Sequence, residues 1–182
     1  MKLPGFINKM WRAVRLGYLK MIREPMPPHN IAIGLAVGVF AGFLPIIPFQ
    51  TSVARVFAWP VRGSKIAAAL GTWVSNPLNW VPFYMMLYYV GKAVSPFSVP
   101  PFNPSLLEFK VMIQQGWQWL AVMCVGGVVL GIPASIISYV LCLRAVKVYR
   151  ARKAARRAAA KAEAVIREKR LAAGKTAGQR NA

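Results

Sequence analysis

Three long stretches without a charged side chain constrain this 182-residue chain more than any other feature. They extend from Pro25 to Ala54, from Ile66 to Gly91 and from Val111 to Leu143. Each is longer than the ~20 apolar residues that a helix needs to cross the hydrocarbon core of a bilayer. A water-soluble domain would interrupt such windows with charges, so the sequence predicts an all-α integral membrane protein.

The basic residues, which give the chain a net charge of +20, are segregated from these stretches. Arg144 to Ala182 alone carries thirteen Lys and Arg against two Glu, among many alanines. We therefore expect an amphipathic interfacial helix over residues 1–24, a membrane domain over 25–145 and a basic, alanine-rich cytoplasmic tail over 146–182. The tail is predicted to be a basic C-terminal helix that frays after Gly174.

The N-terminal helix is predicted from the spacing of its apolar residues, Ile7, Trp11, Val14, Tyr18 and Ile22. This periodicity favours an amphipathic helix whose apolar face lies in the headgroup region of a bilayer. A helix that packs against another part of the same protein is one alternative. A secretory signal peptide is the other, and it is disfavoured because the apolar run leads into Pro45 and Pro48 and not into a clear cleavage site.

Two of the apolar stretches contain a helix break. In the first, Pro45 and Pro48 remove backbone donors and end the helix that begins at Ile31. In the second, the sequence Ser75-Asn76-Pro77 has the same effect. The third stretch, Trp117 to Leu143, predicts an ordinary spanning helix.

The distribution of Lys and Arg places both termini in the cytoplasm, which requires an even number of crossings. We therefore expect the first stretch to turn at Pro45–Pro48 and to return as a broken, re-entrant helical hairpin. The second and third stretches then form the two spanning helices. In this arrangement the loop 60–65 lies inside, and the uncharged segment from Ser95 to Leu107 lies outside.

Polar side chains flank both breaks, and with the helix-break prolines they form the candidate site. Backbone groups freed by a break must be satisfied inside a bilayer, and paired broken helices mark the substrate sites of many transporters. Two interpretations stay open: a shared solute or ion site, and caps that cross-link two kinked helices. The residues are Gln50, Thr51, Ser52, Thr72, Ser75, Asn76 and Asn79, with Pro45, Pro48 and Pro77.

Small residues recur every four positions in all three stretches, which is typical of helices that pack closely in lipid. We call each such row of small residues a ladder. We expect the ladders to hold the three segments together, or to mediate self-association of the chain into a homo-oligomer. The glycines concerned are Gly34, Gly38, Gly42, Gly71, Gly127 and Gly131.

Catalytic and metal-binding chemistry is not expected. The four acidic residues and the single histidine are scattered, whereas acid–base catalysis and metal sites need such groups to converge. We therefore predict neither an enzyme nor a cofactor. Arg55 is expected to reach the cytoplasmic interface, and the tryptophans Trp59, Trp73, Trp80, Trp117 and Trp119 are expected to anchor the helices at the interfaces.

The stretches Asn30–Gln50 and Gly71–Tyr84 resemble the two signatures of the bacterial membrane proteins grouped as domain of unknown function 2062. The resemblance covers roughly residues 15 to 145, and Asn79 stands where the family usually has Thr. It implies a location in the bacterial cytoplasmic (inner) membrane and no particular activity. The basic tail lies outside it.

Three functions follow as expectations. The first is a non-enzymatic assembly or accessory bundle, and the second is a channel or carrier for a small solute or ion at the paired breaks. The third is a tether for RNA or ribosomes through the basic tail. Because that tail has no interleaved aromatic residues, we expect it to bind anionic lipid headgroups rather than nucleic acid.

Overall fold

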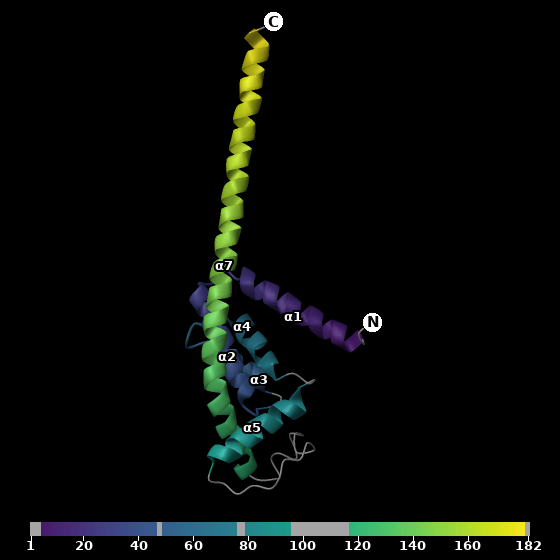
Figure 1. Cartoon of the computed structure of the whole chain (residues 1–182), viewed down its shortest axis with the longest axis vertical. Coiled ribbons are helices and arrows are strands. Elements are labelled where there is room, and N and C mark those ends of the chain that lie inside the picture. Colours follow the sequence, from purple (N-terminus) through teal and green to yellow (C-terminus); the bar gives the residue numbers. More distant parts are fainter. Residues whose placement is uncertain (1–4, 47–48, 76–78, 96–116, 181–182) are drawn as a thin grey trace. The chain divides into compact units, whose positions relative to one another are not determined.

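The computed structural model describes residues 5–46, 49–75, 79–95 and 117–180, and every regular element within them is a helix (Figure 1). The all-α prediction is therefore confirmed. The chain divides into two units, Met1–Arg144 and Ala145–Ala182. The elements are α1 (Gly5–Arg23), α2 (Pro28–Phe43), α3 (Gln50–Ala58), α4 (Lys65–Gly71), the 3-10 turn η1 (Thr72–Val74), α5 (Trp80–Val94) and α7 (Trp117–Arg180).

Prolines and a serine set the ends of the short helices. α2 starts with Pro28, at a position where the missing N–H is not needed. It ends at Phe43, because the next residue, Leu44, takes the extended backbone that a following proline favours. α4 starts after Ser64, whose hydroxyl accepts a hydrogen bond from the backbone N–H of Ala67 at 3.0 Å.

α2 and α3 form an antiparallel hairpin. After α3, the backbone N–H of Ser64 donates to the carbonyl of Asn30, near the start of α2, at 3.0 Å. The side-chain amide of Asn30 donates in turn to the carbonyl of Arg62, also at 3.0 Å. The chain thus turns between Phe43 and Gln50 and returns to the end at which α2 begins, as a hairpin requires.

α4 then runs beside α2 in the same direction. Gly34 lies against the backbone of Ser64, and one turn later Gly38 lies against the backbone of Ala68. At the end of α2, Gly42 meets Thr72. A Cβ at Gly38 would overlap the carbonyl of Ala68, so only glycine allows the two helices to approach this closely.

α5 and the first half of α7 pack around an aromatic core that includes Phe43, Phe83, Tyr84 and Tyr88. Gly91 of α5 faces Gly126 of α7, and a side chain on either would meet the other helix's backbone. This close contact also explains Trp119, which was predicted to be an interfacial anchor. It is instead a core residue, 2% exposed and stacked on Tyr88 with the ring centroids 5.0 Å apart.

α7 is antiparallel to α2 within the first unit. Gly127 lies against the carbonyl of Phe43, at the end of α2. Further along α7, the hydroxyl of Tyr139 lies 2.7 Å from Nδ1 of His29, at the start of α2. The two helices therefore run side by side in opposite directions.

The two halves of α1 differ in how far they are buried. Its C-terminal part packs on α4, where Gly17 meets Leu70 and where Met21 and Ile22 are buried. Trp11 and Tyr18 are exposed on its surface. The alternative of a helix packed on the same protein thus holds for the second half of α1.

The second unit consists of the last part of α7, and the side chains of residues 151–164 are exposed. The prediction that the tail helix frays after Gly174 is wrong, because α7 remains helical to Arg180. A single glycine disfavours a helix by only about 1 kcal/mol, which neighbouring alanines offset.

Among the described residues, one helix is long and apolar enough to cross a membrane, within Gln118–Ala164. Only 28% of its apolar window is buried inside the protein. The helices Pro28–Phe43 and Lys65–Val74 are apolar but shorter.

Candidate functional site

Gln50, the first residue of α3, closes the end of α2. Its side-chain nitrogen lies 3.0 Å from the carbonyl oxygen of Ala41, 2.7 Å from that of Gly42 and 3.2 Å from that of Leu44. The carbonyl of Ala41 also accepts the backbone N–H of Leu44 at 3.2 Å, and that of Leu44 accepts the N–H of Ile46 at 2.8 Å, but no further helical turn follows to bond this end of α2. The amide has two hydrogens for three acceptors, so the bonds are shared. Gln50 therefore supplies the donors that the next helical turn would have supplied.

The same side chain joins the first break to the second. Its oxygen accepts a hydrogen bond from the hydroxyl of Ser75 at 3.1 Å. Beside it, the hydroxyls of Thr51 and Thr72 lie 3.2 Å apart. Thr72 donates its single proton to the carbonyl of Ala69 at 2.8 Å, so Thr51 is the donor to Thr72. The two breaks, separate in the sequence, are thus one polar cluster.

Asn79 closes the second break as Gln50 closes the first. Its side-chain amide donates to the carbonyl of Val74, the last residue of η1, at 2.8 Å. In both breaks, an amide that follows the interruption bonds to the end of the helix that precedes it. This shared arrangement gives both breaks a local structural role.

Tyr84 of α5 is the buried residue that completes the cluster. It is fully buried, and its hydroxyl faces the side chains of Ser75 and Gln50. Its oxygen nevertheless has no hydrogen-bond partner at bonding geometry among the described residues. A buried hydroxyl without a partner costs about 1–3 kcal/mol, so this position differs from the satisfied groups around it.

The structure brings together part of the predicted set. Gln50, Thr51, Thr72 and Ser75 form the cluster, whereas Ser52 is exposed on α3 and lies outside it. Pro45 is buried beside the end of α2. The predicted residues Asn76, Pro48 and Pro77 lie outside the described residues.

The predicted packing glycines all face other segments of the same chain. Gly34, Gly38 and Gly42 face α4 and η1, and Gly71 faces α2 in return. In α7, Gly127 and Gly131 both lie against Phe43. The ladders therefore hold this chain's own helices together, which is the first of the two roles expected for them.

Sequence reasoning missed the polar cluster at the opposite end of α2. The buried hydroxyl of Ser64 donates to the carboxylate of Glu24 while it caps α4. A serine before the run Lys-Ile-Ala-Ala-Ala is a recognisable N-cap signal, but its partner Glu24 is distant in the sequence. Gly91 and Gly126 were also missed, because neither belongs to a four-residue ladder.

The groups at the breaks are hydroxyls and amides, which donate and accept hydrogen bonds without carrying charge. Within the described ranges, no three His, Cys, Asp or Glu side chains come together in a way that would hold a metal ion. The cluster is therefore suited to bonding backbone, water or a neutral polar group.

Comparison with known proteins gives one match. A family described as an uncharacterized protein conserved in bacteria (DUF2062) matches residues 11–155. No curated protein and no solved structure matches the chain. The matched range contains both helix breaks, the hairpin and the core around Tyr84. The chain therefore belongs to the bacterial family DUF2062.

Proposed function

We propose that this chain is a multi-pass protein of the bacterial cytoplasmic membrane, which acts without catalysis as an accessory or assembly bundle. The observation that carries the proposal is the closed hydrogen-bond network at the two breaks. Within a bilayer, free backbone carbonyls must bond to protein or water, and Gln50 and Asn79 meet this need. Because these neutral groups bond to backbone carbonyls and to one another, the network is suited to holding helices together.

The exposed surface of α7 supports a lipid environment. A core helix of a soluble protein is mostly buried, whereas 28% of the apolar window of α7 is buried. Its exposed residues are large and aliphatic, and Ile136 and Ile137 are each 59% exposed. Such a surface is stable in contact with acyl chains and unfavourable in water.

The position of the breaks supports a re-entrant hairpin. Gly127, which touches the end of α2, lies about 15 Å further along α7 than Trp117, at ~1.5 Å per residue. The hydrocarbon core is ~30 Å thick, so a span starting near Trp117 puts the breaks close to its middle. α2 and α3 would then enter and leave on the same side.

The basic residues support the orientation. Arg62 and Lys65 are exposed in the loop that bonds to Asn30 at the start of α2. The same end of α2 meets Tyr139, shortly before Arg144 in α7. Lys and Arg that flank spans stay in the cytoplasm, so both termini are assigned to that side.

Cysteine labelling in intact cells tests this topology. In a variant without Cys124 and Cys142, we expect Lys65→Cys to be protected from a membrane-impermeant maleimide and Ser98→Cys to react. Lys65 is preferable to Ser64 as a probe because Ser64 is buried. Labelling of Lys65→Cys from outside would contradict the hairpin, and recovery of the chain in the soluble fraction would contradict membrane insertion.

Photo-crosslinking tests the accessory role. A photoreactive residue at Ile137, on the exposed face of α7, is expected to give a discrete protein adduct in native membranes. The same residue at the buried position Tyr84 serves as the control and is expected to give only intrachain products. Adducts with lipid alone at several exposed positions would contradict an assembly partner.

A carrier for a small polar solute is the second candidate, favoured by the buried hydroxyl of Tyr84, which has no hydrogen-bond partner within the part of the chain that the structure describes. Paired helix breaks near the middle of a bilayer line the substrate sites of many transporters. If solute flux into liposomes containing the protein is observed, Tyr84→Phe is expected to abolish it without unfolding the chain. Absence of flux for a broad panel of solutes would rule the carrier out and leave the accessory role.

A further inference from the structure

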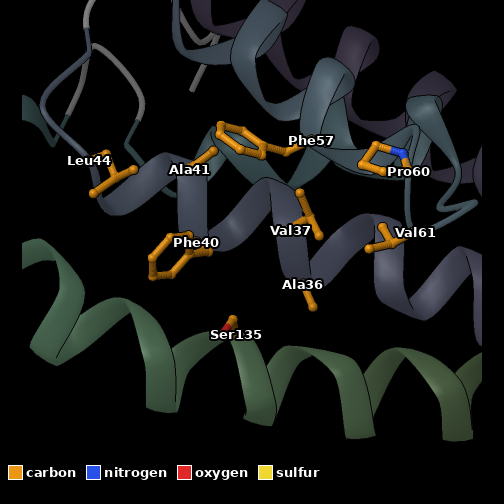
Figure 2. Close-up of a pocket in the computed structure, with 9 residues that line it drawn as sticks. All are labelled: Ala36, Val37, Phe40, Ala41, Leu44, Phe57, Pro60, Val61 and Ser135. Carbon is orange, nitrogen blue, oxygen red and sulfur yellow. The ribbon is translucent and has the colours of Figure 1, made fainter.

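A groove of about 430 Å³ lies over one face of α2, between the segment that ends α3 on one side and α7 on the other (Figure 2). Its volume falls within the roughly 300–1,000 Å³ of most ligand sites. It is separate from the break cluster, since none of the hydrogen-bonded side chains of that cluster lines it. Its main lining residues are Val37, Phe40, Leu44, Phe57, Val61 and Ser135.

The groove is apolar along most of its length. α2 provides its floor at Val37, Phe40 and Leu44, positions that share one face of the helix. Phe57, in the last turn of α3, and Val61, in the loop after it, form one wall, and both are exposed. Ser135 is the only hydroxyl-bearing residue among the residues that line it, and its proton goes to the carbonyl of Ile132 at 2.8 Å. A ligand bound in this groove would contact mainly apolar side chains.

One end of the groove adjoins a basic residue in the sequence. Val61 is followed directly by Arg62, whose side chain is exposed. The backbone of Arg62 has a φ of 52°, and its carbonyl accepts the amide of Asn30 at 3.0 Å. The other end, at Leu44, adjoins the helix break. The groove therefore runs from the helix break at Leu44 to Val61, which precedes Arg62 in a loop whose backbone is fixed by Asn30.

We propose that this groove binds one anionic phospholipid, with an acyl chain over α2 and the phosphate at Arg62. The inference rests on the proposed membrane location, in which Leu44 lies near the middle of the bilayer and Arg62 at the cytoplasmic surface. The apolar lining of the groove and the arginine that follows Val61 then suit the acyl chain and the phosphate of a lipid from that leaflet. A guanidinium forms strong, geometrically specific hydrogen bonds with phosphate oxygens, which an isolated apolar face cannot provide.

Native mass spectrometry of the delipidated full-length protein tests the proposal. The probes are phosphatidylglycerol and phosphatidylcholine with identical dioleoyl chains. We expect one phosphatidylglycerol to be retained per chain, with an affinity about tenfold above that of phosphatidylcholine, as one charge-assisted hydrogen bond provides. Arg62→Gln is expected to remove this preference, and Arg55→Gln, an exposed arginine of α3, is the control that keeps it.

Filling the groove separates acyl-chain binding from headgroup attraction. Ser135→Phe is expected to reduce the retention of both lipids about tenfold or more, the factor that losing a buried alkyl group produces. Val128→Phe, on the exposed surface of α7 away from the groove, is the control and is expected to leave retention unchanged.

Three outcomes would overturn the inference. The first is equal retention of phosphatidylglycerol and phosphatidylcholine by the wild type. The second is an equal loss of the preference for phosphatidylglycerol in Arg62→Gln and Arg55→Gln. The third is disulfide cross-linking of two copies through Val37→Cys, which would show that a second copy covers the groove. None of these outcomes would change the result of the cysteine labelling that tests the topology. Failure of membrane insertion in that labelling would instead refute the proposed function itself.

Discussion

The polar groups near the two ends of α2 differ, because those at the C-terminal end are neutral and those near the N-terminal end include charged side chains. At the C-terminal end, the amide of Gln50 bonds to backbone carbonyls and to Ser75. At the N-terminal end, the carboxylate of Glu24 accepts a hydrogen bond from Ser64, and Arg62 is exposed in the adjoining loop. Removing a charge from water costs far more than removing an amide that keeps its hydrogen bonds. The contrast is consistent with the proposed membrane location, in which the N-terminal end of α2 lies at the aqueous surface and the C-terminal end lies within the bilayer.

Loss of Gln50 tests the neutral end most severely. Gln50→Leu would remove the hydrogen bonds from the amide to the carbonyls at the end of α2 and the bond that it accepts from Ser75, each worth about 0.5–1.5 kcal/mol. We expect the free energy of unfolding in lipid nanodiscs to fall by about 3 kcal/mol or more. Ser52→Ala, on the exposed side of the same helix, is the control; equal effects of the two changes would refute the capping role.

The second-largest effect is expected in the middle of α2, where Gly38 packs directly against the backbone of α4. Gly38→Leu would force α2 away from Ala68, and overpacking of this kind costs about 1–3 kcal/mol. The expected result is a lower unfolding temperature, with Val129→Leu on the exposed face of α7 as the control. Unchanged stability with a loss of oligomers would show instead that Gly38 packs against a second copy.

A smaller effect is expected at the charged end. Ser64→Ala removes the N-cap of α4 together with the hydrogen bond to Glu24, and loss of a cap costs about 1 kcal/mol. Thermal unfolding of the full chain measures the loss, and Lys65→Gln, at the exposed neighbouring position, serves as the reference. A loss as large as that of Gln50→Leu would remove the distinction between the two ends.

The smallest change is expected beyond the first unit. Removal of residues 150–182 is expected to alter the free energy of unfolding of the remaining chain by less than about 0.5 kcal/mol, as for exposed substitutions. The described side chains of residues 151–164 are exposed, and this explains the small effect. A drop comparable to that of Ser64→Ala would mean that the tail contributes to the packing of the first unit.

The sequence was sufficient to predict the breaks because their causes are local. Proline cannot donate a backbone hydrogen bond and disfavours helix in the residue before it. Pro45 therefore ends α2 independently of the contacts that the helix makes with the rest of the protein. The four-residue spacing of Gly34, Gly38 and Gly42 likewise marks a face for close packing. Both features are visible without knowledge of the tertiary structure.

The partners across the fold could not be predicted in the same way. That Gln50 bonds to Ser75, and Ser64 to Glu24, depends on how the hairpin places distant segments. Trp119 was misassigned for the same reason, since tryptophan suits both an interface and a core. Only the approach of Gly91 to Gly126 places Trp119 against Tyr88.

The brevity of α3 has a consequence for biogenesis. A helix of nine residues extends over only about 14 Å, less than half of the hydrocarbon thickness. In the proposed membrane setting it has no stable position in lipid until α4 and η1 have been synthesised, because Ser75 and Thr72 supply partners for its first two residues. The translocon would therefore release the hairpin and the following segment together, as one insertion unit, rather than helix by helix.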